Sequence, residues 1–412
     1  MIKSKNIWYI SKYANIKKYG ADTRHASFCE EFAKAGHKVR LITSNSSHLY
    51  NNLPKFKNRY YDEISNNFNV TWVNTLKYSK ATSIKRICSW LWFDFFVLMM
   101  AFKKKYEKPD VVIASSLSLF TVLTGCFYKR FYKAKFIFEV RDIWPQTLID
   151  LKGFSSNHPL IWLLNKIERL GYKYSDAIVG TMPGLKLHVE NEVGLGSKVH
   201  CIPQGVNLAF YDNSQQKLSE EYVEQYIPKN KFIVTYSGTF GEANALEYII
   251  EAAKKLKRTS KIHFLLVGEG YLKEELKDNA SELTNITFAP KVVKEQVQHL
   301  LSLSDLLVAS VRDEKIYKYG MSLNKFIDYM YAKKPIVCMY SGYPSMVNEA
   351  KCGEFTPAEN SNEFASVIKK YQLMTPLDRQ QIGELGYKFL ISERSFGVLS
   401  KRYMELFNEA SL

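Results

Sequence analysis

The sequence predicts an α/β protein with two successive doubly wound, parallel-sheet domains. Short apolar runs alternate with helical patterns along nearly the whole chain, an order typical of parallel strands joined by helices. A length of 412 residues is too great for one ordinary core and fits two domains of about 200 residues each. The 46% apolar and 24% charged residues are typical of a folded protein in water.

In the first half, strands are expected wherever a short apolar run lies between polar turns. These runs are 7–10, 38–43, 69–73, 111–114, 135–140, 177–179 and 200–202. A helix is expected from about Arg24 to Ala35, because Phe28, Phe32 and Ala35 share one face and Gly36 follows.

The second half repeats this alternation. Its expected strands are 232–237, 263–267, 286–289, 306–309, 336–339 and a short one near 354–355. Its expected helices are 245–257, 272–279, 294–303, 323–332, 343–349 and 361–372. The tail from 376 to 412 has no strand pattern and is expected to form helices at 385–390 and 396–407.

The charge changes at the join between the halves, near residues 203–207. Residues 1–205 contain 31 Lys and Arg against 15 Asp and Glu, a net charge of +16, whereas residues 206–412 contain 26 of each. We therefore expect domains at 1–205 and 206–380, with helices at 381–412 packing back on the first domain. A basic domain attracts nucleic acid or an anionic membrane surface, and a merely solvated basic face is the alternative.

One apolar segment, Cys88–Phe102, is 15 residues long, contains Asp94 and has basic flanks. It is shorter than the roughly 20 residues that span a bilayer. It can lie in a membrane interface or cover a sheet as a buried helix, and we favour burial of most of it with the basic ends touching lipid. The six cysteines show no C-x-x-C pair and the start shows no signal peptide, so a cytoplasmic location is expected.

The most informative segment is 317–337. Gly320, Ser322, Asn324 and Lys325 open an apolar helical run that carries one carboxylate, Asp328. A helix N-terminus offers free N–H groups and a positive dipole end to a phosphate. The lysine adds a point charge, and a carboxylate one turn later suits the hydroxyls of a ribose. The segment therefore predicts a nucleotide site.

Loops after the strands of a doubly wound sheet lie at the edge where ligands bind. The loop 11–25 is basic and contains Gly20, but it lacks the G-x-G-x-x-G pattern of a nicotinamide site. The loop 139–145 places Arg141 and Asp142 directly after a strand; we favour a functional role for Asp142 over a structural salt bridge. In the second half, Arg312 follows a strand and, with Lys325, could hold a diphosphate.

An ordered set of motifs resembles the family 4 glycosyltransferases over nearly the full length of the chain. The motifs are AGHKV at 35–39, EVRDIWP at 139–145, SDAIVG at 175–180, IPQGVN at 202–207, YSGTFG at 236–241, LVGEG at 266–270 and the segment 322–335. The resemblance implies a GT-B fold, in which two Rossmann-like domains face across a cleft. The most similar branch acts in bacterial surface-polysaccharide assembly and includes N-acetyl-L-fucosamine transferases.

The resemblance also implies site roles. The residues expected at the donor are Gly238, Thr239, Gly241, Gly270, Pro290, Lys291, Gly320, Met321, Ser322, Asn324 and Asp328. Asp328 would bind the ribose, the backbone of 320–324 the diphosphate, and Pro290 and Lys291 would border the base. Arg312 and Lys325 would neutralise the leaving diphosphate. The residues expected at the transferred sugar and acceptor are Asp142, Arg141, Gly20 and Ala21.

The chain departs from the family pattern at three places. Gly320 occupies the position of the first glutamate of the usual E-x7-E pair, and the second is Asp328. The Arg and Lys expected after Gly238 are replaced by Thr239 and Asn244. Arg141 stands where a histidine is common. We expect Arg312 and Lys325 to replace the lost cations.

The expected activity is retaining transfer of a sugar from a nucleotide-diphosphate donor, most simply UDP-linked, with an N-acetylated amino sugar as one candidate. No D-x-D pair occurs, so no metal and no other cofactor are expected. The acceptor would be a polyprenyl-diphosphate-linked saccharide in O-antigen or capsule assembly, at the inner face of the cytoplasmic membrane. The alternatives are a nucleotide-sugar epimerase of the same fold, a nucleic-acid-binding protein, for which no groove-reading element is present, and a pseudoenzyme.

Overall fold

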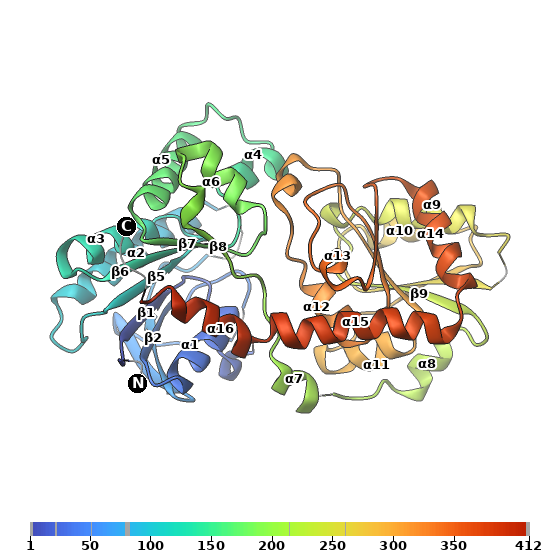
Figure 1. Ribbon diagram of the computed structural model, residues 1–412, viewed down its shortest axis with the longest axis horizontal. Helices are drawn as coiled ribbons and strands as arrows, with labels where there is room; N and C mark the ends of the chain where they lie inside the picture. Colours follow the sequence, from blue (N-terminus) through green and yellow to red (C-terminus); the bar gives the residue numbers. More distant parts are fainter. Residues whose placement is uncertain are drawn as a thin grey trace. The chain divides into compact units, whose positions relative to one another are not determined.

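The computed structural model describes residues 3–20, 23–50, 52–78, 83–213, 215–259 and 261–408. The chain divides into two compact units, the first made of Met1–Gly205 and Phe396–Leu412 and the second of Val206–Ser395 (Figure 1). Each unit has its own sheet and its own apolar core.

The sheet of the first unit has the strand order β3-β4-β2-β1-β5-β6-β7-β8. Its strands are β1 (Asn6–Ile10), β2 (Lys38–Ser44), β3 (Tyr60–Ser65), β4 (Phe68–Val73), β5 (Val111–Ser115), β6 (Lys135–Val140), β7 (Ala177–Gly180) and β8 (Val199–Cys201). All neighbours pair in parallel except β3 and β4. All seven strands expected in the first half of the chain are therefore present, and β3 is an additional strand that was not expected.

Helices cover both faces of this sheet. They are α1 (Arg24–Lys34), α2 (Ile84–Met99), α3 (Thr121–Tyr132), α4 (Gln146–Lys152), α5 (Pro159–Tyr174), α6 (Leu185–Val193) and α16 (Phe396–Glu405). Phe28 and Phe32 of α1 pack against Tyr403 of α16 on one face. Phe93 and Val97 of α2 pack on the other face with Trp8. Because Trp8 and its neighbour Tyr9 alternate between the two faces, both sides of β1 are buried.

The second sheet is wholly parallel, with the order β11-β10-β9-β12-β13-β14. Its strands are β9 (Phe232–Ser237), β10 (Ile262–Val267), β11 (Ile286–Ala289), β12 (Leu306–Ser310), β13 (Ile336–Met339) and β14 (Gly353–Thr356). Its helices are α7 (Leu208–Asn213), α8 (Glu220–Tyr226), α9 (Leu246–Lys255), α10 (Lys273–Asn279), α11 (Val297–Ser302), α12 (Asn324–Tyr331), α13 (Val347–Ala350), α14 (Ser361–Leu373) and α15 (Pro376–Arg394).

Two helices differ from expectation for local reasons. The helix expected at 343–349 begins only at Val347, because Tyr343 precedes a proline and Met346 has a φ of +41°. The tail helix expected at 385–390 extends over Pro376–Arg394, with a capping box at Thr375 and proline in the first turn. The boundary expected at 381 therefore falls inside α15, which belongs to the second unit, and only α16 belongs to the first.

Candidate active site

The donor residues expected from the sequence gather at the carboxyl edge of the second sheet. Its parallel strands β9, β10, β11 and β12 end on the same side, so the loops that follow them are neighbours. Helix α12 begins at Asn324, and an η6 turn (Lys315–Tyr319) precedes it. This arrangement is built from residues of the second unit alone.

Lys325 in the first turn of α12 meets the loop after β9. Its Nζ donates to Tyr236 Oη at 3.1 Å and to Asn244 Oδ1 at 3.0 Å, and it lies 4.2 Å from the centre of the Tyr236 ring. A Cβ on Gly238 would lie 3.2 Å from the same Nζ. The contacts that hold this cation are thus neutral oxygens, and burial lowers its pKa to about 8. A lysine without a counter-charge is a suitable partner for a phosphate.

The glycines after β9 and β10 have a packing role in addition to the expected donor contact. A Cβ on Gly270 would lie 2.1 Å from the carbonyl oxygen of Phe240, and one on Gly268 would lie 1.8 Å from that of Gly238. The two loops therefore pack backbone against backbone, and Phe240 N donates to Glu269 O at 2.9 Å. There is room beside Gly241, since a Cβ added there would lie 3.8 Å from its nearest neighbours, the side chains of Thr239 and Tyr271.

The chain before α12 provides polar groups at the start of the helix. Gly320 has a φ of +97°, a conformation that side-chain-bearing residues rarely adopt, which explains glycine at this position. Met321 is buried and its carbonyl accepts from Ser345 Oγ at 3.3 Å. Ser322 Oγ is buried and has no hydrogen-bond partner among the described residues, while Asn324 is exposed. An unpaired hydroxyl at a helix start is a candidate ligand contact.

Asp328 lies one turn after Lys325 and is held by residues that the sequence reading missed. Tyr211 Oη donates to its Oδ1 at 2.6 Å, and Lys294 forms an ion pair with the same oxygen. Gln298 Nε2 donates to its backbone carbonyl at 3.1 Å. Tyr211 lies on α7, far away in sequence, so spacing alone could not have revealed it. The ribose role expected for Asp328 stays a prediction.

Arg312 is engaged differently from the expected free cation. Its guanidinium forms an ion pair with Glu247 of α9, and Glu359 lies 3.9 Å away. Arg312 contacts carboxylates, whereas Lys325 contacts Tyr236 and Asn244, so the structure does not bring the two cations onto one partner. The charge of Arg312 is already balanced by carboxylates, which makes it a weaker candidate for the diphosphate.

The residues expected at the base follow β11. Tyr222 Oη of α8 donates to the Pro290 carbonyl at 2.8 Å, which fixes the backbone there. Lys291 is exposed and lies near Glu269 of the loop after β10. These two residues thus adjoin the same edge as Gly270.

In the first unit, the loop after β6 is pinned through its backbone. Arg141 N donates to Ser116 Oγ at 2.9 Å and Thr181 Oγ1 donates to Arg141 O at 2.9 Å. Asp142 is exposed and forms no ion pair with a described residue, so the structural salt bridge considered as its alternative is absent there. Gly20 ends the η1 turn (Lys17–Tyr19) and is exposed; Ala21 lies outside the described residues.

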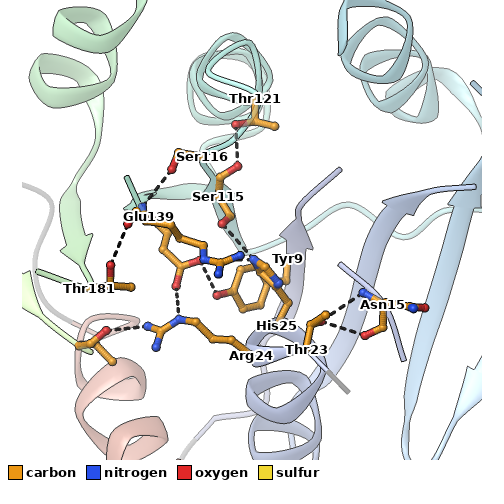
Figure 2. Close-up of polar contacts among 12 residues, drawn as sticks. Tyr9, Asn15, Thr23, Arg24, His25, Ser115, Ser116, Thr121, Glu139 and Thr181 are labelled. Carbon is orange, nitrogen blue, oxygen red and sulfur yellow. Dashed lines mark hydrogen bonds and ion pairs between the residues drawn. The ribbon is translucent and has the colours of Figure 1, made fainter. Parts of the chain in front are cut away.

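A buried polar network beside this loop was not expected (Figure 2). Glu139 Oε1 accepts from Arg24 Nε at 3.0 Å and Oε2 accepts from Tyr9 Oη at 2.8 Å. Arg24 also donates to the carbonyls of Ile202, at 2.7 Å, and Pro203. His25 Nε2 lies 3.1 Å from Ser115 Oγ. Tyr9, Ser115 and Glu139 lie near the carboxyl ends of their strands, and Arg24 and His25 lie in the first turn of α1.

The charges of this network are set by burial and by one another. Burial alone would raise the pKa of the Glu139 carboxyl, but Arg24 and other positive groups outweigh it and lower the pKa to about 2. Burial, together with the nearby Arg141, lowers the pKa of His25 to about 3, so the imidazole is neutral at physiological pH. The network is an ionised Glu139–Arg24 pair with a neutral histidine, which is a structural arrangement that ties β1, α1 and β6 together.

The described residues contain no group of three or more His, Cys, Asp or Glu side chains placed to hold a metal ion. Among the described helices, none combines the length and the apolar content that crossing a bilayer requires. Helix α2, which contains most of the apolar segment 88–102, buries one face and exposes Leu91 and Phe95. The burial expected for most of this segment is therefore found on one face of the helix, and the other face is exposed.

Two family models match the chain in sequence. The model described as "Glycosyltransferase Family 4" matches residues 20–210, and the one described as "Glycosyl transferases group 1" matches residues 231–372. A protein of Escherichia coli K12 named for colanic acid biosynthesis, the glycosyl transferase WcaI, is 25% identical over 72% of this chain and 73% of its own. The alpha-D-kanosaminyltransferase of Streptomyces kanamyceticus is 22% identical over 52% of this chain and 55% of its own.

Solved structures share the fold at low identity. Sucrose-phosphate synthase from Thermosynechococcus elongatus aligns with a TM-score of 0.72 and 15% identity over 98% of both chains. Anabaena HepE in complex with UDP-glucose aligns with a TM-score of 0.62 and 12% identity over 97% of this chain and 98% of its own. The two α/β units share the GT-B fold of these neighbours, and the two family models, which match most of the sequence between them, support a glycosyltransferase of family 4.

Proposed function

We propose that this glycosyltransferase moves a sugar from a UDP-linked donor to a polyprenyl-diphosphate-linked saccharide, with retention at the anomeric carbon. The second unit would bind the donor and the first unit the acceptor. The reaction would serve the assembly of a surface polysaccharide such as O-antigen or capsule, at the inner face of the cytoplasmic membrane. An N-acetylated amino sugar is the donor sugar that we favour.

The arrangement around Lys325 carries the donor part of this proposal. Its Nζ is held by Tyr236 and Asn244, which bring no negative charge, and Ser322 Oγ at the same helix start has no partner among the described residues. A diphosphate would supply the charge that Lys325 lacks and an acceptor for the Ser322 hydroxyl. The positive end of α12 adds to the attraction.

The comparisons support the choice of donor and product class. The Anabaena HepE structure holds UDP-glucose, and a trehalose-6-phosphate structure from E. coli, with a TM-score of 0.73 and 11% identity over 99% of this chain, holds UDP-2-fluoro glucose. One relative is named for the transfer of an amino sugar, kanosamine, and another for colanic acid biosynthesis. These names motivate the amino-sugar donor and the polysaccharide role.

In the proposed reaction the bond between the anomeric carbon and the donor diphosphate breaks, and an acceptor hydroxyl oxygen bonds to that carbon on the same face. The acceptor proton passes to a phosphate oxygen of the departing UDP. Charge builds up on the diphosphate in the transition state, so a fixed cation is most effective there. We assign this task to Lys325, and the exposed Asp142 is the candidate contact to the transferred sugar.

The test begins with donor choice. The purified protein is screened by thermal shift against UDP, GDP and ADP sugars, and stabilisation by UDP sugars is expected, since a ligand that binds only the folded state raises its stability. The best donor is then incubated with and without a prenyl-diphosphate-linked saccharide. Transfer only in the presence of acceptor supports the proposal, whereas an isomerised donor without acceptor would identify an epimerase instead.

A further inference from the structure

A second cationic cluster lies at the carboxyl edge of the first sheet, outside the network of Glu139. Lys12 follows β1 and its side chain is buried, with 1% of the residue exposed. Its Nζ donates to Ser46 O at 3.0 Å and lies 4.9 Å from the centre of the Tyr13 ring and 5.1 Å from that of Tyr78. Among the described residues, no carboxylate forms an ion pair with it. A buried ammonium that is not paired costs folding free energy unless a ligand compensates it.

Further basic groups surround the same two tyrosines. Arg86 in the first turn of α2 donates from Nε to Tyr13 Oη at 3.0 Å. Lys77, which is exposed, donates to Asn45 O. The imidazole of His48 stacks edge-on against Tyr13, and its buried Nδ1 has no partner among the described residues. The site therefore offers three cations and a free ring nitrogen within an aromatic wall.

Asp94 is the carboxyl group whose charge acts on Lys12, but the two form no ion pair. Asp94 of α2 accepts from Ser118 Oγ at 3.0 Å and Thr124 Oγ1 at 3.3 Å, and burial raises its pKa to about 8, so it is mostly protonated at neutral pH. Burial, and then the charge of Arg86, lowers the pKa of Lys12 to about 7. Both shifts have burial as their largest cause, so the site is one in which the protein stabilises charge poorly.

The helix that supplies Arg86 also presents apolar side chains to solvent. Leu91, Trp92 and Phe95 are 48%, 39% and 53% exposed, and Phe102 just beyond α2 is 70% exposed. Leu91, Phe95 and Phe102 follow one another at helical spacing. The exposed lysines 103–105 come directly afterwards. Exposed aromatic side chains with adjacent lysines are complementary to an anionic bilayer surface.

We propose that Lys12, Lys77 and Arg86 bind the diphosphate of a prenyl-diphosphate-linked acceptor, and that the exposed face of α2 rests on the membrane that holds its lipid. This inference rests on the proposed function and names the head-group site for its acceptor. Lysine and arginine are the strongest phosphate donors among side chains, and Lys12 keeps N–H donors beyond its bond to Ser46. The positive end of α2 lies beside Arg86 and adds to the attraction.

Binding of a short-chain probe tests the site. Farnesyl diphosphate is titrated by calorimetry in saturating UDP, so that the donor site is already filled. Lys12→Met and Arg86→Ala are each expected to raise the Kd by about tenfold or more, because each removes a charge-assisted hydrogen bond. Lys85→Ala, one residue away and exposed, is the matched control and should bind like wild type. If all three variants bind farnesyl diphosphate with the wild-type affinity, the assignment of Lys12 and Arg86 to the diphosphate is overturned.

Two further probes separate the lipid from a free anion. Farnesol should bind much more weakly than farnesyl diphosphate, and inorganic pyrophosphate should bind more weakly than the prenyl ester. Pyrophosphate binding as tight as that of the ester, with the same losses in the variants, would reduce the site to a free-diphosphate site and overturn the acceptor assignment. If Lys12→Met does not fold, Lys77→Ala at the exposed side replaces it.

Vesicle sedimentation tests the face of α2. Phe95→Ser is expected to lower binding to phosphatidylglycerol vesicles, whereas Leu187→Ser on α6, which is also 53% exposed, serves as the control. Equal sedimentation of both variants would overturn the membrane part. UDP affinity is measured in every variant. If the variants keep wild-type UDP binding, transfer and farnesyl diphosphate binding, this site is rejected and the proposed function stands. If the wild-type protein does not bind UDP, the proposed function itself is rejected.

Discussion

The carboxyl edges of the two sheets use buried cations in opposite ways. In the first unit, Arg24 is sealed into an ion pair with Glu139. In the second unit, Lys325 is held by neutral oxygens of Tyr236 and Asn244. The first cation has a carboxylate partner, whereas the second forms no ion pair with a described residue, and we propose that a ligand supplies its counter-charge.

The difference teaches that residue type and position after a strand do not by themselves identify a ligand contact. Arg312 follows a strand, as the sequence predicts, but it forms an ion pair with Glu247. Lys12 also follows a strand, and no described carboxylate pairs with it. We propose that a structural cation has a carboxylate within ion-pair distance and that a ligand-binding cation has none. Four predictions test this distinction, in order of decreasing effect.

The largest effect is expected from Glu139→Gln. The substitution leaves Arg24 buried without a counter-charge, which costs about 3–5 kcal/mol of the free energy of unfolding. Tryptophan fluorescence in urea is the measurement, because all six tryptophans lie in the first unit: Trp8, Trp72, Trp90, Trp92, Trp144 and Trp162. Glu107→Gln, which removes an exposed partner of Lys38, is the control and should leave the midpoint unchanged. Similar urea midpoints for both variants would contradict the claim that Glu139 compensates the buried charge of Arg24.

Lys325→Ala should have the next largest effect. It is expected to lower the turnover number by about 10²–10³-fold, the loss typical of removing one group that stabilises charge in a transition state. Steady-state transfer assays measure it, with Lys315→Ala, an exposed lysine in the η6 turn, as the control. Near-normal turnover by Lys325→Ala would show that this cation does not face the diphosphate.

The pH dependence of UDP affinity sharpens the same assignment. Burial lowers the pKa of Lys325 to about 8, so the free protein loses this charge as the pH rises through that value. Bound diphosphate favours the charged form and raises the pKa, so affinity should fall by up to about tenfold per pH unit above about pH 8. Calorimetry from about pH 7 to about pH 10 measures the fall. The same fall in Lys325→Ala would assign it to another group.

The smallest effect is expected from Arg312→Ala. Because Glu247 and Glu359 already balance its charge at a partly exposed position, turnover should fall by less than about tenfold. The transfer assay used for Lys325→Ala measures it, and Glu247→Gln gives the complementary variant in which Arg312 loses its partner. A loss as large as that of Lys325→Ala would mean that the donor draws Arg312 away from its carboxylates.

Most of the sheet strands could be read from the sequence because parallel strands covered on both faces are continuous apolar runs. Strand β3 escaped because it is half exposed and reads Tyr-Tyr-Asp-Glu-Ile-Ser, a pattern without a clear apolar run. The full length of α15 had a local signal, the Thr375 capping box with Pro376, that could have found it. Tyr211, by contrast, meets Asp328 across 117 positions, and no local pattern encodes that contact.

The sequence by itself determined the two-unit α/β architecture, the concentration of positive charge in residues 1–205 and the loops that follow the strands, because these depend on composition and on periodicity along the chain. Only the tertiary structure decided which charged residues are paired. Arg24 and Glu139 are 115 positions apart and become partners when β1, α1 and β6 assemble, whereas the hydrogen bonds of Lys325 to described residues go to the neutral groups of Tyr236 and Asn244. Electrostatic energies depend on distances of a few ångströms and on burial, and both are properties of the fold rather than of the order of residues.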